Sequence, residues 1–164
     1  VKDVPEGYIG QKIITLLDNT IIDSFANLVK YEVSLKYNLS YDKLINDYEY
    51  KCKHRQILIN YAENQKEIHG NDIWVKRLIH KYDSNNCVIV TDLRFKDEFE
   101  YIKNNNIKYI IIRLEISDKT RKLHGWIYDE TIDTDKSEID LDNTQFEHIL
   151  YDNYSMNDVK LIIS

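Results

Sequence analysis

The chain has 164 residues, of which 43% are hydrophobic and 30% charged, and this is the size and composition of one globular domain. No apolar run approaches the ~18 residues of a membrane span, so the sequence predicts neither a membrane protein nor a signal peptide. The net charge of −6 argues against a general nucleic-acid binder, because tracking phosphates needs a broad basic surface.

The predicted elements alternate between strands and helices along the chain. In chain order, the residue patterns predict a strand over 20–24, helices over 25–36, 41–48, 53–67 and 73–81, a strand over 87–91, a helix over 96–104, a strand over 108–114, a helix over 117–123, a strand over 146–150 and a helix over 157–163. Such alternation predicts a parallel sheet with helical crossovers, and therefore one α/β domain spanning residues 1–164.

The stretch 87–91 is the clearest predicted strand, and a polar tip follows it at once. Its apolar, β-branched run ends in Asp92 and Arg94. In open α/β sheets the carboxyl ends of the strands usually face the ligand, so we expect these side chains to line a cleft. Arg94 has an alternative role as a surface ion pair with Asp97 or Glu98. Cys87 opens the run and is expected to pack as a small hydrophobe, and neither it nor Cys52 predicts a disulfide.

Basic residues are concentrated in one part of the chain. Residues 51–81 carry seven Lys and Arg against three acids, whereas residues 128–164 carry ten acids against two bases. On a helical wheel Lys51, Arg55 and Lys66 fall within about 60° of one another. Three cations on one face favour a compact anionic ligand, although a solvated helix face is the alternative.

Several motifs, read in order, resemble one group of P-loop kinases, which contains the phosphomevalonate kinases and the phage-type deoxynucleoside monophosphate (dNMP) kinases. The resemblance covers about residues 20–160 and rests on Ser24-Phe-Ala-Asn-Leu-Val-Lys30, Tyr50-Lys-Cys-Lys-His-Arg55, Asn71-Asp-Ile-Trp74, Val90-Thr-Asp-Leu-Arg94, Arg121-Lys-Leu-His-Gly-Trp126 and Ser137-Glu-Ile-Asp-Leu-Asp142-Asn143. It implies a three-layer P-loop NTPase-like domain, like that of nucleoside monophosphate kinases, with a parallel sheet flanked by helices. It also implies ATP and Mg2+ as cofactors, an acceptor-binding helical region at about 38–82 and a lid at about 117–136.

The resemblance assigns roles to individual residues. Four basic residues match the acceptor-phosphate pocket, two arginines match the catalytic and lid positions, and three polar residues match positions that support them. The residues of the acceptor-phosphate pocket are Lys30, Lys51, Arg55 and Lys66. Arg94 matches the catalytic arginine and Arg121 the lid arginine. The supporting polar residues are Asp92, Ser137 and Glu138. Arg121 is expected to close over the nucleotide and bind it, and to act in catalysis together with Arg94. No residue is assigned as a metal ligand.

The phosphate-binding loop is the main departure from the group. A P-loop reads Gly-x4-Gly-Lys-Ser/Thr, because its glycines let backbone N–H groups wrap the phosphates and its hydroxyl holds Mg2+. The best candidate here is the stretch from Gly7 through Gly10 to Lys12, in which Gln11 replaces the last glycine and Ile13 the metal-binding residue. We predict that Gly7, Gly10 and Lys12 bind nucleotide, with Lys12 also catalytic, in a degraded or incomplete loop.

The resemblance leaves the acceptor open. Phe95 and His124 stand where the mevalonate branch carries arginines, which favours a dNMP over phosphomevalonate as the acceptor. A catalytically inactive, kinase-derived binding or assembly module is the alternative from another class. We expect small nucleotides as ligands, no direct nucleic acid and no membrane. A homodimer or a subunit of a larger assembly both fit, and the expected location is the cytoplasm, including that of a virus-infected host cell or a phage-infected bacterium.

Overall fold

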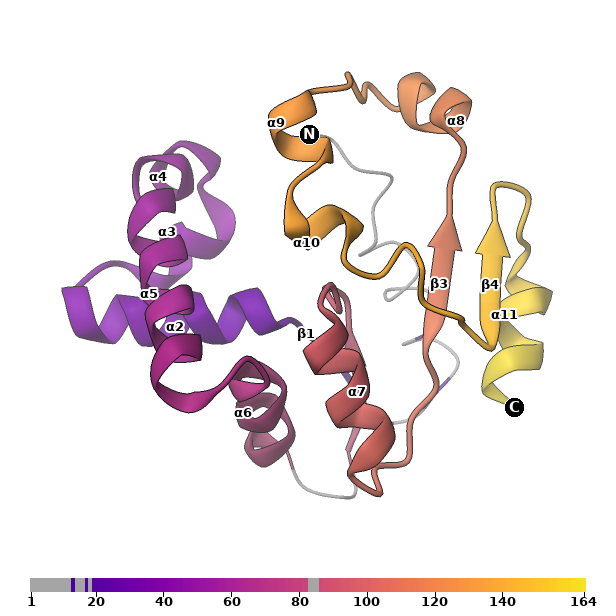
Figure 1. The fold of residues 1–164 in the computed structure, drawn as a ribbon, viewed down its shortest axis with the longest axis horizontal. Coiled ribbons are helices and arrows are strands. Elements are labelled where there is room, and N and C mark those ends of the chain that lie inside the picture. The colour runs from indigo at the N-terminus through magenta and orange to yellow at the C-terminus, as the bar shows by residue number, and fades with distance from the viewer. Residues whose placement is uncertain (1–12, 14–16, 18, 83–85) are drawn as a thin grey trace.

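The computed structural model describes residues 13, 17, 19–82 and 86–164 (Figure 1). Its strands are β1 (Thr20–Asp23), β2 (Cys87–Val90), β3 (Ile112–Glu115) and β4 (His148–Tyr151). Its helices are α2 (Phe25–Tyr37), α3 (Tyr41–Asn46), α4 (Tyr48–Lys53), α5 (Arg55–His69), α6 (Ile73–Lys81), α7 (Lys96–Asn104), α8 (Asp118–Leu123), α9 (Glu130–Asp133), α10 (Lys136–Ile139) and α11 (Met156–Ile163).

The strands pair in parallel, as the alternation of elements predicts. β1 pairs with β2 in the register Thr20↔Cys87, and β3 pairs with β4 in the register Ile112↔His148. Over the described residues these are two separate two-stranded sheets rather than one. The predicted mixed α/β class is therefore confirmed, whereas the three-layer P-loop architecture stays a prediction.

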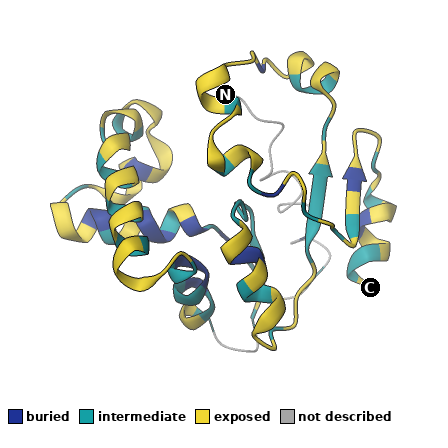
Figure 2. Cartoon of the chain, in the orientation of Figure 1, coloured by how far each residue is buried: buried dark blue, intermediate teal, exposed yellow. Residues whose placement is uncertain are grey.

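Two apolar clusters hold the fold together. The first joins α2 to α6, with Phe25, Val33 and Trp74 buried and the inner face of α5 packed against them. The second surrounds Leu150 of β4 and Val159 of α11. It also takes in Ile13, Ile89 of β2, and Ile112 and Leu114 of β3, so both strand pairs border one core. Figure 2 shows these buried stretches on the inner sides of α2, α6 and β4.

The helical region differs from its prediction in one way that matters for the site. The predicted helix over 41–48 ends at Asn46 as α3, and a further helix, α4, begins at Tyr48, because the Asp47 side chain accepts the N–H of Tyr50 and starts it. A second break at His54 separates α4 from α5. Lys51 thus lies on a different helix from Arg55 and Lys66, and the single helical face predicted for the three is wrong.

Other differences concern strands and short helices. Cys87 is exposed, because it stands at the first position of β2, so its predicted packing role is wrong. β3 begins at Ile112 rather than at 108, and the structure adds α9 and α10, which the sequence patterns did not indicate. Over the residues that the structure describes, none of the helices has the length and apolar character needed to cross a bilayer.

Candidate functional site

The carboxyl end of β2 is tied directly to the start of α2. Asp92, two residues beyond the strand, accepts the backbone N–H groups of Phe25 and Ala26 at 2.8 Å each. A carboxylate is stable there, because the first turn of a helix leaves its N–H groups free and carries the positive end of the helix dipole. Burial raises the pKa of Asp92, and these two N–H groups together with Arg94 and Lys30 oppose that rise.

Five basic side chains carry charges that act on one another or on the acids near this strand end, and we call them the cation cluster: Lys30, Lys51, Arg55, Lys66 and Arg94. On one side, burial lowers the pKa of Lys30, and the nearby charge of Lys51 lowers it further. Asp92 attracts both Lys30 and Arg94. The four residues that the resemblance assigns to the acceptor pocket come from α2, α4 and α5, and Arg94, assigned to catalysis, comes from the β2–α7 loop.

An acidic segment on α10 and just before it lies against the arginines of the cation cluster. Arg94 Nη1 donates to Glu138 Oε1 at 2.6 Å. Hydrogen bonds from Ser137 lower the pKa of Asp135, and the charges of Arg55 and Arg94 lower it further. Arg94 therefore makes its ion pair with Glu138, and the alternative pairing with Asp97 or Glu98 is wrong for its guanidinium group.

An aromatic ring lies inside the cation cluster. Phe95 has the ammonium group of Lys66 at 4.0 Å from its ring centroid and that of Lys136 at 5.9 Å. A ring face attracts cations, so Phe95 helps to hold two lysines beside each other despite their repulsion. Lys66 also donates to Glu63 at 3.0 Å. The sequence comparison noted Phe95 only as a missing arginine and did not predict this contact.

Beneath the cluster, Glu98 of α7 is a second functional candidate that sequence reasoning missed. It is 2% exposed, and one of its carboxylate oxygens accepts the backbone N–H groups of both Arg94 and Phe95 at 3.2 Å. Burial raises its pKa to about 7, against the opposing effect of these N–H groups; Asp92 raises it further and Lys66 lowers it. The signal available in the sequence was a glutamate at the third position of a predicted helix, where its side chain can reach back to the N–H groups at the helix start.

The predicted lid arginine, Arg121, contacts an aromatic ring and two carboxylates close to it in the sequence. Arg121 of α8 stacks over the Trp126 ring at 3.9 Å, and it pairs with Asp133 at 3.3 Å and Asp118 at 3.8 Å. The Trp126 indole N–H also donates to Asp133 at 3.0 Å. Glu138, one candidate partner for Arg121, is instead bonded to Arg94. Trp126 itself is buried, at 8% exposure.

The donor side of the site is only partly described. Gly7, Gly10 and Lys12 lie outside the described residues. Ile13 stands where the group carries a metal-binding hydroxyl or its substitute, and its side chain is buried in the apolar cluster around Leu150 and Val159. That position supplies no oxygen ligand, so it does not fit Mg2+. Among the described residues, no three His, Cys, Asp or Glu side chains cluster as metal ligands.

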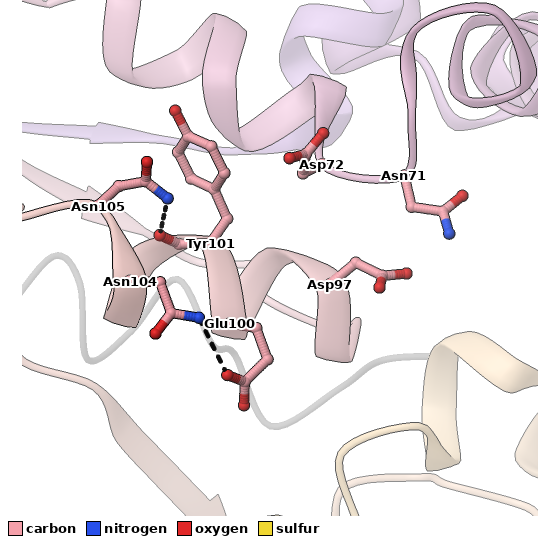
Figure 3. A pocket seen from close by; sticks show the side chains of 7 residues that line it. All are labelled: Asn71, Asp72, Asp97, Glu100, Tyr101, Asn104 and Asn105. Carbon is pink, nitrogen blue, oxygen red and sulfur yellow. Dashed lines mark hydrogen bonds between the residues drawn. The ribbon is translucent and has the colours of Figure 1, made fainter.

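The hollow drawn in Figure 3 lies outside the cation cluster. It is a cavity of about 420 Å3 between the start of α6 and the exposed face of α7, lined by Asn71, Asp72, Asp97, Glu100, Tyr101, Asn104 and Asn105. Its three carboxylates repel a phosphorylated ligand, so it does not suit an anionic substrate. A second cavity of about 450 Å3 lies where β3 and β4 end, lined by Glu115, Ile116, Ser117, Tyr151, Asp152 and Asn153.

Comparison of the sequence with protein-family models identifies the family of the chain. Residues 5–108 match the family model described as phosphomevalonate kinase. The chain belongs to the phosphomevalonate kinase family. The matched part runs from before β1 through α7 and contains the whole cation cluster. Arg121 and the acidic segment lie beyond it. Among curated protein sequences, none matches the chain. This finding supports the kinase resemblance for one of the two named branches, the phosphomevalonate kinases, and gives no support specific to the dNMP branch.

The pairing of Arg94 with Glu138 leads to a testable expectation. A phosphate group and the Glu138 carboxylate compete for the same guanidinium, so Glu138→Gln should tighten the binding of inorganic pyrophosphate about two- to fivefold. The gain is modest because both partners are more than a third exposed, and water screens such pairs. Isothermal titration calorimetry measures it directly. Glu147→Gln, at an exposed acid outside the cluster, should leave the dissociation constant unchanged. Weaker binding by Glu138→Gln would contradict the competition.

Proposed function

We propose that this chain is a kinase that transfers the γ-phosphate of ATP to a small acceptor already carrying a phosphate group. The observation that carries the proposal is the cation cluster, whose charges act on Asp92, Glu98 and Asp135 near the carboxyl end of β2. Three of them, Lys51, Arg55 and Lys66, come from the helical region, and two lie beside the strand end. Arginine presents a planar pair of donors to phosphate, and lysine supplies a point charge.

The proposed acceptor is phosphomevalonate, and membership of the family supports it. In this proposal Lys30, Lys51, Arg55 and Lys66 bind the acceptor phosphate, and Arg94 neutralises charge on the transferred group. Phosphoryl transfer asks a protein for positioning and charge neutralisation more than for covalent chemistry, and the cluster offers both. The Arg94 pair with Glu138 would be exchanged for the bound phosphate.

A dNMP is the second candidate acceptor, and Phe95 is the observation that favours it. The ring replaces an arginine of the mevalonate branch, and its centroid lies 4.0 Å from the ammonium group of Lys66 and 5.9 Å from that of Lys136. An aromatic surface beside phosphate-binding cations suits a ligand with a flat base, since stacking on a ring stabilises a base. If a dNMP is the acceptor, the chain resembles the phage-type kinases, and a viral or phage source is proposed with it.

The donor nucleotide is proposed to bind on the other side of the strand ends. The P-loop architecture that this requires is supported by the parallel pairing of β1 with β2 and of β3 with β4. The cavity where β3 and β4 end offers Ile116, Tyr151 and Asn153, which are apolar, aromatic and amide side chains of the kind that suit a base. Arg121 remains the proposed contact of the lid region with the nucleotide.

The decisive experiment mixes the purified chain with ATP, Mg2+ and either phosphomevalonate or each dNMP, and follows ADP release together with the phosphorylated product. Turnover of phosphomevalonate would support the first candidate, and turnover of dNMPs alone would establish the second. A thermal-shift titration runs beside it, because ligand at a hundredfold excess over its dissociation constant adds ~2.7 kcal/mol of stability. A shift with acceptor but no turnover with any acceptor would overturn the kinase and leave a binding module.

A further inference from the structure

Glu98 is a buried acid whose partners are backbone groups of the candidate site. One oxygen of its carboxylate accepts the N–H of Arg94 and the N–H of Phe95, both at 3.2 Å. At 2% exposure it ranks among the most buried charged groups of the described residues. A carboxylate placed in the interior costs stability unless hydrogen bonds compensate for the lost water, so a buried acid in this position needs a reason.

The two N–H groups belong to the residues whose side chains enter the cation cluster. From the same short loop, the Arg94 guanidinium reaches Glu138 and the Phe95 ring lies under Lys66. The carboxylate fixes the direction of both peptide groups, and the direction of a peptide group sets where the attached side chains point. Two N–H groups on one oxygen also fix the loop more firmly than one.

Further contacts hold the loop at its two ends. On the strand side Asp92 is bound to the N–H groups at the start of α2, and on the helix side the N–H of Lys96 donates to Asp140 at 2.8 Å. Between these two anchors, Glu98 accepts the N–H groups of Arg94 and Phe95, and the carbonyl of Phe95 accepts the N–H of Phe99 at 3.1 Å. The charged groups that act on it are Asp92 after β2 and Lys66 of α5.

We propose that Glu98 is a positioning residue, which holds Arg94 and Phe95 in place for the phosphorylated ligand by accepting their backbone N–H groups. This inference rests on the proposed anion-binding function. It predicts that the hydrogen-bond acceptor is what matters at position 98, and that a neutral acceptor can replace the carboxylate. An amide oxygen has two lone pairs and can accept both N–H groups, whereas a thioether of similar length accepts neither well.

The test compares Glu98→Met, Glu98→Gln and wild type for binding of inorganic pyrophosphate by calorimetry, at a temperature where all are folded. We expect Glu98→Met to weaken binding about tenfold or more, since a misplaced donor loses the charge-assisted bonds of Arg94. Glu98→Gln should restore the affinity to within about threefold of wild type, because it keeps the acceptor. Glu100→Met, at an exposed acid two residues along the same helix, is the matched control and should bind as wild type does.

Each outcome decides a different claim. If wild type does not bind pyrophosphate, the proposed function fails and the role of Glu98 fails with it. If wild type binds and folded Glu98→Met binds equally well, the role of Glu98 alone is overturned. Should Glu98→Met not fold, Glu98→Asp replaces it: the carboxylate withdraws by one methylene while the charge stays. Binding by folded Glu98→Asp should weaken, and affinity equal to wild type would refute the positioning role.

Discussion

Replacing Arg94 with alanine should lower the rate of phosphoryl transfer by ~10^3-fold, which is the lower end of the effect of arginines that stabilise the transition state. Arg94 is the member of the cation cluster that stands directly beyond β2, and its guanidinium is held by one exchangeable carboxylate contact. Arg94→Lys should recover only part of this loss, because lysine keeps the charge but not the planar pair of donors. The measurement is kcat and KM for ATP-dependent transfer to the acceptor that the wild type uses.

Arg113→Ala is the matched control for this experiment. Arg113 of β3 has two carboxylate partners, Glu115 and Asp142, at 3.0 Å each, and no member of the cation cluster is among its contacts in the described structure. It should keep kcat and KM close to those of wild type. A drop in kcat for Arg94→Ala no larger than that for Arg113→Ala would remove Arg94 from the catalytic role.

The second large effect concerns stability and pH. Glu98→Gln should be more stable than wild type by about 3 kcal/mol at pH 8, and the difference should vanish toward pH 4.5. Burial raises the pKa of Glu98 from 4.5 to about 7 in the folded protein, so the folded state binds a proton that the unfolded chain releases. The contribution of this group to stability therefore falls as pH rises from 4.5 to 7, and the full cost is present above pH 7. Glutamine has no such proton to lose.

Urea unfolding of both proteins at pH 5, 6, 7 and 8 measures this difference. The comparison between variant and wild type isolates Glu98, because the other shifted groups, among them Asp92 and Asp23, are present in both proteins. Glu100→Gln should show no pH-dependent gain. A Glu98→Gln protein less stable than wild type at pH 8 would mean that the carboxylate is worth more to the fold as a charge than its burial costs.

Much of the secondary structure follows from local patterns in this chain. The predicted helix over 25–36 matches α2, because Ser24 accepts the N–H of Asn27 at the helix start. Gly70, with φ of +96°, ends α5 two residues beyond the predicted end at 67. The break between α4 and α5 at His54 was not predicted, because the residues on both sides of it favour a helix. No proline or glycine marks the point where the helix axis changes direction. The short helices α9 and α10 depend on aspartate caps at Asp129 and Asp135 in a segment read only as acidic.

The sequence offers a set of candidate site residues, but their geometry could not be predicted from it. Helical periodicity placed Lys51 and Arg55 on one face of one helix, whereas they lie on two helices, α4 and α5, that pack against each other. Glu98 escaped detection because burial of an acid cannot be read from a helix rich in acids. The Glu138 pairing joins residues 44 positions apart, and no local rule links such a pair.

The way Arg121 is held has a consequence for the entropy of binding. A free arginine loses about 2 kcal/mol of rotamer freedom when a ligand immobilises it. Here stacking on Trp126 and the contacts with Asp118 and Asp133 already restrict the side chain during folding. An anion that binds Arg121 would contact a side chain whose rotamers are already restricted. Little additional conformational entropy would be lost on binding. The same contacts link the guanidinium to the indole and to both carboxylates, so the arginine and its surroundings would shift toward a nucleotide as one piece.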